Sequence, residues 1–287
     1  MKFEARYPNH PLLKKYIQYY YFVKTDSPAH YSRYYSFPNT TMPVNIHRNV
    51  TVSIEKEKVQ IRESAAAGIT AIVNGMREAP LQVEWNGNID KLTIAFKPAG
   101  LNAFINEPLQ HAVRGFTNIF TGWDSLPEYQ VFLQKLYTTA DINKRTQTTE
   151  DFLLDICRPY EKEPLLYTAI DILGDFTNEK TISETAAVLN IAERSFNRLF
   201  KNYVGIAPVG YRKIARFRQS LENKVIKEKF KRLTDISYES NYYDQAYYIK
   251  MYKKLTGKSP KNLYKAIAKL ADDNVIFEFL EKTIDFG

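Results

Sequence analysis

Two segments in the C-terminal half of the chain combine an apolar face and a cationic face at the spacing of a helix. In the first segment, Phe196, Leu199, Phe200 and Tyr203 share the apolar face. The opposite face carries Arg194, Asn197, Arg198 and Lys201. In the second segment, the corresponding outer face carries Gln245, Tyr247, Lys250 and Lys254. Cationic faces bind polyanions because each neutralised phosphate releases counterions, so the indicated chemistry is binding of a nucleic acid.

The two segments are copies of one pattern. Each copy contains, in the same order, a small residue, an asparagine that can form a turn, aromatic residues and a Gly-x-x-Pro sequence. The two copies are offset by 51 residues up to the asparagine and by 52 residues after it. The first copy contains Ala186, Asn190, Phe196, Phe200, Lys201, Gly205 and Pro208. The second contains Ser237, Asn241, Tyr248, Tyr252, Lys253, Gly257 and Pro260. A repeat of this size indicates one supersecondary unit built twice.

The pattern predicts a helix-turn-helix in each copy. Thr181 and Glu184 have the spacing of a capping box, which starts a helix, and Asn190 tolerates the left-handed conformation that ends one. A second helix is expected from Glu193. In the second copy we expect helices over 233–240 and 244–255, but Arg232 replaces the capping threonine.

A basic helix is expected to join the copies. Each copy ends in Gly-x-x-Pro, where glycine ends one helix and proline opens the next. The connecting helix should span about 208–223 and carries Arg212, Lys213, Arg216 and Arg218.

Residues 191–201 and 242–260 resemble the AraC/XylS family of bacterial transcriptional regulators. The resemblance covers about 165–268 and implies two helix-turn-helix units joined by a linker helix, behind an effector-sensing or dimerising domain. Asn190 and Asn241 stand where the family usually has glycine, and Ala192 replaces a common capping serine. Residues 207–210 also lack the family's usual Ser and Lys.

The resemblance implies which side chains read DNA. These are Arg194, Asn197, Arg198, Gln245, Tyr247 and Lys250. Two recognition helices on one rigid linker can enter major grooves about 34 Å apart, and one chain would then read a non-palindromic site. Arg198 suits guanine, whereas Asn197 and Gln245 suit adenine.

Lys201 and Lys253 are expected to contact phosphates. Each of these DNA-reading and phosphate-contacting side chains could instead be simple surface charge.

The charge distribution agrees with this interpretation. Residues 165–270 contain 20 Lys and Arg against 10 Asp and Glu, whereas the rest of the chain carries 20 against 22. The expected partners are double-stranded DNA and RNA polymerase, with a small-molecule effector and a second copy of the chain in a homodimer as further candidates. No signal peptide or membrane segment is indicated, which favours the cytoplasm.

The N-terminal half is expected to be β-rich. Short β-branched and aromatic runs are bounded by Pro, Gly and Asn, with candidate strands at 17–24, 44–55, 66–73 and 91–97. A barrel or sandwich would result. Helices are expected over 124–137 and 150–157, packing on the sheets or forming a dimer contact, with a loop at 138–149 and a domain boundary at 158–164.

The fold class is therefore α+β. It comprises a β-rich sensor or dimerisation domain over 1–160, an all-α DNA-binding domain over 161–270 and an extension over 271–287. Val275, Ile276, Phe279 and Leu280 suggest a short helix in that extension.

Enzymatic and metal chemistry are not indicated. His10, His30, His47 and His111 are far apart in sequence, no cofactor motif is present, and Cys157 lies in an apolar run. The many N-terminal aromatics could fill a core or line a small-molecule pocket. Two alternatives to a regulator remain, namely a DNA-modifying enzyme that would need a reactive cysteine, and a ligand- or protein-binding module whose helix-turn-helix lacks DNA-regulatory activity.

Overall fold

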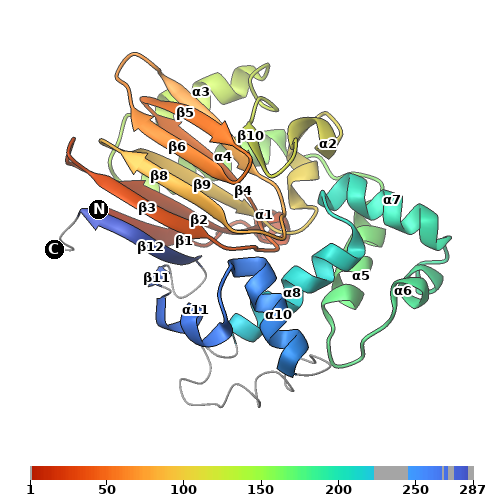
Figure 1. The fold of residues 1–287 in the computed structure, drawn as a ribbon. Coiled ribbons are helices and arrows are strands. Elements are labelled where there is room, and N and C mark those ends of the chain that lie inside the picture. The colour runs from red at the N-terminus through yellow and green to blue at the C-terminus, as the bar shows by residue number, and fades with distance from the viewer. Residues whose placement is uncertain (1, 223–244, 267, 271–274, 284–287) are drawn as a thin grey trace.

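The computed structural model describes residues 2–222, 245–266, 268–270 and 275–283. A β-rich N-terminal half is followed by a helical half (Figure 1). The expected α+β class is therefore confirmed. The first helix and the turn that we expect in the second repeat copy, at 233–241, lie outside the described residues.

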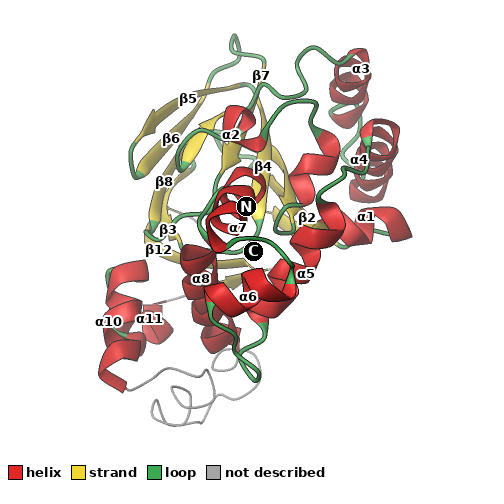
Figure 2. Cartoon of the chain, turned by 90° about the vertical axis from the view of Figure 1, so that its right-hand side faces the viewer, coloured by secondary structure: helices red, strands yellow, loops and turns green. Residues whose placement is uncertain are grey.

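The first sheet places its strands in the order β1-β2-β9-β4-β7-β10, all antiparallel. In chain order they are β1 Lys2–Arg6, β2 Ile17–Lys24, β4 Met42–Arg48, β7 Ile69–Asn74, β9 Asp90–Phe96 and β10 Thr117–Ile119. Helices lie against one face of this sheet (Figure 2), namely α1 Pro11–Tyr16, η1 Gly100–Phe104, α3 Pro127–Leu136 and α4 Ile142–Ile156.

The second sheet has the order β11-β12-β3-β8-β6-β5. Its strands are β3 Tyr31–Ser36, β5 Val50–Glu55, β6 Lys58–Glu63, β8 Leu81–Asn86, β11 Ala268–Leu270 and β12 Val275–Thr283. Apolar side chains of both sheets form one shared core. The N-terminal half is thus a sandwich with an outer helical layer.

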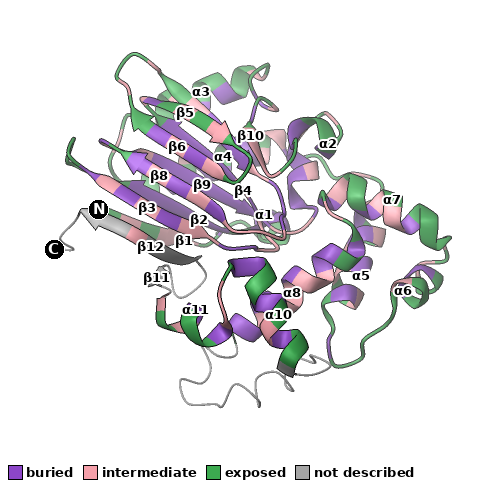
Figure 3. Ribbon diagram, in the orientation of Figure 1, coloured by how far each residue is buried: buried purple, intermediate pink, exposed green. Residues whose placement is uncertain are grey.

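Strand β9 is buried on both faces, as Figure 3 shows for the central strands. Leu92, Ile94 and Phe96 pack in the core that the helices cover. Lys91 and Ala95 lie on the opposite face, toward the second sheet, and are also buried. In the sequence, Leu92, Ile94 and Phe96 alternate with Lys91, Thr93 and Ala95, a pattern that by itself indicates one buried face, whereas the second sheet buries the other face as well.

The helical half forms two cores. Its helices are α5 Glu163–Gly174, α6 Ile182–Val188, α7 Glu193–Val204, α8 Pro208–Glu222, α10 Gln245–Thr256 and α11 Pro260–Ala266. One core surrounds Phe196 and Phe200 and includes Met76 of the N-terminal half. The other surrounds Tyr248 and Tyr252 and includes Phe37 of the N-terminal half.

The structure bears on two further expectations, one for the strand at 44–55 and one for the region at 158–164. Residues 44–55 form two strands in different sheets, because the left-handed Asn49, with φ 55°, separates β4 from β5. Helix α4 ends at Ile156 and α5 begins at Glu163, so the chain leaves the helical conformation around Pro159, while Pro164 lies in the first turn of α5. The domain boundary at 158–164 stays a prediction.

The loop expected at 138–149 is wrong from Ile142 onward, since only 138–141 are non-helical. Helix α4 begins at Ile142, because Asp141 caps it by accepting from the backbone N–H groups of Asn143 and Lys144. The polar residues of this stretch are consistent with a helix, since Thr146 Oγ1 donates to the carbonyl of Ile142.

The short helix expected near the C-terminus is also wrong. Val275–Thr283 is β12, which pairs antiparallel with β3 on one side and with the edge strand β11 on the other. The physical reason is that β3 would otherwise present unpaired backbone groups, and the β-branched and aromatic residues of this segment suit a strand.

Candidate nucleic-acid interface and the cavity beside it

Local signals position the first helix-turn-helix. The capping box is formed, because Glu184 N donates to Thr181 Oγ1 at 3.1 Å and Thr181 N donates to Glu184 Oε2 at 2.7 Å. The turn after α6 has Asn190 in the left-handed region at φ 53°, and Gly205, at φ 85°, is the C-cap that follows α7. The predicted helix-turn-helix at this position is therefore confirmed, with α7 as its second helix.

The outer face of α7 carries the predicted DNA-reading residues. Arg194, Arg198 and Lys201 are exposed, while Phe196 and Phe200 on the inner face are fully buried. Among the described residues, no hydrogen bond or ion pair engages these three cationic side chains. Asn197 differs from them, because it is half-buried and its Nδ2 donates to the carbonyl of Glu193 at 2.9 Å.

The C-terminal end of α7 is attached to the N-terminal half. Asn102 Nδ2 donates to the carbonyl of Tyr203 at 2.7 Å. The rings of Tyr160 and Tyr203 stack with centroids 5.6 Å apart. The first unit is thus held at a fixed position on the sandwich.

Four cationic side chains of the linker helix α8 contact other parts of the same chain. Arg212 and Arg216 both form ion pairs with Glu179. Lys213 Nζ lies 3.4 Å from Glu78 Oε2, on the loop between β7 and β8. Arg218 is buried against the sandwich. These four cations therefore fix α8 in place.

Helix α10 has the inner face expected for the second unit. Tyr248, Met251, Tyr252 and Leu255 are buried. Tyr247 is 39% exposed, and Lys250 and Lys253 are exposed. The side chain of Gln245 lies outside the described part of the chain. Both predicted recognition helices thus turn their polar faces outward, as far as the structure describes them.

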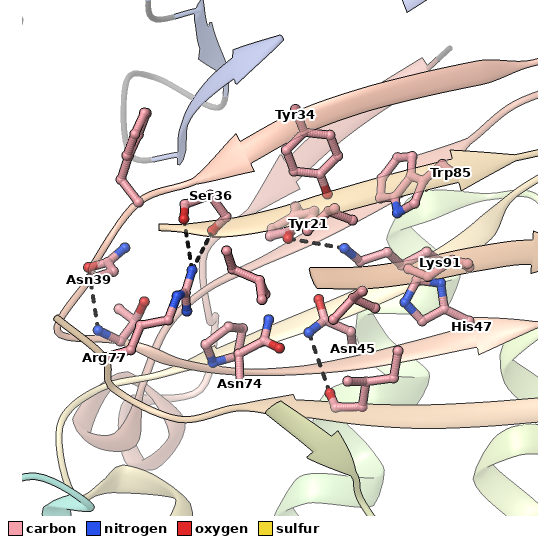
Figure 4. A pocket seen from close by; sticks show the side chains of 18 of the residues that line it. Tyr21, Tyr34, Ser36, Asn39, Asn45, His47, Asn74, Arg77, Trp85 and Lys91 are labelled. Carbon is pink, nitrogen blue, oxygen red and sulfur yellow. Dashed lines mark hydrogen bonds between the residues drawn. The ribbon is translucent and has the colours of Figure 1, made fainter. Parts of the chain in front are cut away.

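A cavity of about 80 Å³ lies between the two sheets (Figure 4). Strands of both sheets line it, and Arg218 of α8 joins them. Figure 4 shows Lys91, His47 and Trp85 together at one end, and Arg77 and Ser36 at the other. Tyr21, Tyr34 and Asn45 are labelled between these ends.

The cations of the cavity are deeply buried. Burial lowers the pKa of Lys91 to about 7 and that of Arg77 to about 10. Burial, together with the charge of Lys91, holds the pKa of His47 well below its usual range, so its imidazole is neutral. Lys91 Nζ lies 3.3 Å from the Tyr21 hydroxyl and 5.1 Å from the centre of the Trp85 ring. The aromatic rings therefore solvate this ammonium in part.

Sequence reasoning missed most of this cavity. It considered an aromatic pocket but assigned no role to Lys91 or Arg77. A signal was present, since Lys91 and Thr93 alternate with apolar residues on β9, as Asn45 and His47 do on β4. Polar residues on the same face of adjacent strands can mark a polar interior as well as a solvated surface.

Features that would indicate other functions are weak. Cys157 is 7% exposed, and burial raises the pKa of its thiol, which disfavours the thiolate. The described residues contain no group of three or more His, Cys, Asp or Glu side chains that could hold a metal ion. In the same part of the chain, no helix is long and apolar enough to cross a membrane.

Comparison with known proteins gives two family matches. Residues 185–266 match the model of a helix-turn-helix domain. Residues 5–115 match a domain of unknown function (DUF6597). A search of curated proteins found no match.

Solved structures of ToxT from Vibrio cholerae are similar in arrangement. One is 10% identical with a TM-score of 0.46, and the match covers 84% of this chain and 97% of that one. A second, described as bound to an unsaturated fatty acid, is 13% identical with a TM-score of 0.42, covering 84% and 94%.

The family match spans the first unit and α10, where the predicted helix-turn-helix residues lie. The C-terminal part of the chain therefore contains a helix-turn-helix domain of the AraC type.

Proposed function

We propose that the chain regulates transcription by reading a specific DNA sequence with α7 and α10, and that its N-terminal half modulates this binding. The observation that carries the proposal is the outer face of α7. Three exposed cationic side chains stand there above a fully buried aromatic face, on a helix that a capping box and a left-handed turn hold in position.

The side chains of α7 have distinct roles in this proposal. Arg198 donates two hydrogen bonds to a guanine, the pairing that best suits a guanidinium in the major groove. Arg194 contacts a neighbouring base, and Lys201 neutralises a phosphate. Asn197 would have to exchange its bond with the Glu193 carbonyl for one with adenine.

Helix α10 acts in the same way. Tyr247 and Lys250 contact bases, Gln245 contacts adenine, and Lys253 binds a phosphate. Because α8 joins the two units, both helices would enter successive major grooves on one face of the duplex.

Modulation through the N-terminal half is supported by its contacts with both units. Asn102 holds the end of α7, while Phe37 packs in the core of α10. A change within the sandwich would therefore alter the relative position of the two recognition helices. Binding of a small-molecule effector is the change that we propose, and RNA polymerase and a second copy of the chain remain expected partners.

The proposed homodimer does not use the apolar face of α3. Tyr129, Phe132 and Leu136 of that face are buried in the chain's own core. A dimer contact would need another surface. Action in the cytoplasm also remains part of the proposal.

An enzymatic role has less support. A DNA alkyl transferase needs a reactive thiolate, and Cys157 is buried with a raised pKa. A helix-turn-helix module that has lost DNA binding would show no salt-dependent DNA affinity.

The test is selection of binding sites from random duplexes with the full chain, followed by a titration at several salt concentrations. We expect one preferred, non-palindromic site, and Lys250→Ala should weaken binding to it. Lys135→Ala is the matched control, because Lys135 is an exposed helical cation on α3. Wild-type affinity in Lys250→Ala would argue against α10 entering the groove.

A further inference from the structure

The cavity between the sheets contains two buried cations, Lys91 and Arg77, that have no acidic partner within the described residues. Lys91 and Arg77 are 4% and 6% exposed. The residues that line the cavity include no Asp or Glu. Arg218 differs from them, because the charge of Glu222 acts on it. Among the described residues, the charge of Arg77 and that of protonated Lys91 are therefore buried here without a compensating carboxylate, which is unfavourable in an empty cavity.

Three buried nitrogen atoms of the same cavity have no hydrogen-bond partner within the described residues. They are His47 Nδ1, Trp85 Nε1 and Arg77 Nε. The three side chains are at most 6% exposed. Buried polar groups are normally satisfied, so unpaired ones that line a cavity indicate a missing ligand or ordered water.

The unpaired groups divide between the two ends of the cavity. His47 and Lys91 are direct neighbours on the paired strands β4 and β9, and Trp85 faces them from the second sheet. Arg77 lies at the other end, where its Nη2 donates to the carbonyl of Ser36 at 2.9 Å (Figure 4). Each end thus combines one buried cation with at least one unpaired nitrogen.

We propose that this cavity binds a small organic dianion with an acid group at each end, of the dicarboxylate class. One acid group would lie against Lys91, His47 and Trp85, and the other against Arg77. The body between them would contact Tyr21 and Tyr34. This inference deepens the proposed regulator by naming the ligand class of its N-terminal half, but ligand binding can be measured without DNA.

The number of charges distinguishes a dianion from a monoanion. A monoanion would compensate Lys91 or Arg77 and leave the other cation buried and unpaired. The cavity volume of about 80 Å³ limits the ligand to a small molecule. Long-chain acids therefore do not fit this arrangement of the strands.

The ligand would also contact the DNA-binding half. Arg218 of α8 lines the cavity, and α8 joins the two helix-turn-helix units. Because Arg218 is a cation on the cavity wall, an anion bound in the cavity would attract it, and with it the linker helix, toward the sandwich. Binding of a ligand in the cavity would in this way affect the position of both recognition helices.

The test uses the full chain without DNA, titrated by calorimetry and thermal shift. The probes are succinate, glutarate, adipate and pimelate, each paired with the monocarboxylate of the same length. We expect at least one of the diacids to bind with a stoichiometry of one ligand molecule per chain. Its Kd should be at least ten-fold lower than that of the monocarboxylate of the same length. Binding to the native state should raise the Tm in a saturable way.

Variants identify the site. Lys91→Met and Arg77→Met should each weaken diacid binding at least ten-fold, whereas Arg62→Met, which removes an exposed cation of β6, should not. Trp85→Phe removes the indole N–H, keeps an aromatic ring at this position, and should weaken binding several-fold with the fold retained. This variant tests the site even if the Lys91 or Arg77 variant fails to fold.

Three results would overturn the inference. Equal binding of monocarboxylates would remove the case for two acid groups. Diacid binding that is unchanged in Lys91→Met and Trp85→Phe would place the ligand elsewhere. Absence of saturable binding by all diacids would mean that the cavity holds only water. None of these results affects the proposed reading of DNA, which the site-selection experiment tests separately.

Discussion

Glu78 of the N-terminal half forms an ion pair with Lys254 of α10, with Oε2 and Nζ 3.1 Å apart. The same carboxylate lies 3.4 Å from Nζ of Lys213 on α8. Its neighbour Arg77 lines the cavity between the sheets. The loop between β7 and β8 therefore lines the cavity through Arg77. Its next residue, Glu78, contacts both the linker helix α8 and the second recognition helix α10.

We expect Glu78→Gln to increase DNA affinity in the absence of any effector. The ion pair neutralises part of the charge that α10 can offer to phosphates, and exposed pairs of this kind contribute about 0.2–1 kcal/mol. Loss of the pair should tighten DNA binding about two- to five-fold, an effect that decreases at high salt. A fluorescence anisotropy titration measures this.

Glu55→Gln is the control for Glu78→Gln, because it removes the same charge from the exposed edge strand β5. If both variants gain affinity equally, the effect is one of net charge alone. If Glu78→Gln binds DNA more weakly, the ion pair instead holds α10 in its binding position.

A second prediction concerns Arg198. Arg198→Ala should cost about 1–3 kcal/mol of specific binding free energy and relax the preference at one base pair, because a bidentate contact to guanine is lost. Sequencing of sites selected by the variant measures this. Lys201→Ala should instead weaken binding to all sequences alike, and an unchanged site preference in Arg198→Ala would contradict its role.

The helical half could be predicted well because its signals are local. The capping pair Thr181 and Glu184, the turn residue Asn190 and the spacing of Phe196 and Phe200 act within one or two helical turns, and each holds in the structure. The order of the strands depends on pairings between distant segments. No local pattern near Val275 indicates that β12 joins β3.

The cavity shows a different limit of sequence reasoning. Alternation along β9 correctly predicts that Leu92 and Ile94 are buried. The same alternation places Lys91 on the other face, which is usually exposed to solvent. Only the position of the second sheet converts that face into a buried, cationic interior.

The capping box allows a third prediction, for stability. Thr181→Ala removes the hydroxyl that accepts from Glu184 N, and loss of such a cap costs about 0.5–2 kcal/mol of the free energy of unfolding. Denaturation with urea should show a lower midpoint. Thr168→Ala serves as the control, because Thr168 is exposed. Among the described residues, its hydroxyl donates only to the carbonyl of Pro164, within α5. An equal loss in both variants would show that the box contributes little.

The fourth prediction concerns the pH dependence of stability that Lys91 causes. Its pKa is about 7 in the folded protein and about 10.4 in an unfolded chain. Between these values the unfolded state binds more protons, so stability without ligand should rise with pH across this range. Below pH 7, the folded protein carries the full cost of a buried ammonium, on the order of a few kcal/mol.

Lys91→Met should therefore stabilise the ligand-free protein more at pH 6 than at pH 9. His47 is neutral in the folded protein and titrates near pH 6.5 in an unfolded chain, but it is present in both proteins, so its contribution largely cancels in the comparison. Tyr21, with a pKa raised to about 12, and Arg77, with a pKa near 10, keep their charge states over most of this range. Urea denaturation of both proteins at the two pH values measures it. A stability difference that is independent of pH would mean that Lys91 keeps its proton throughout, with water or a bound anion in the cavity compensating its charge.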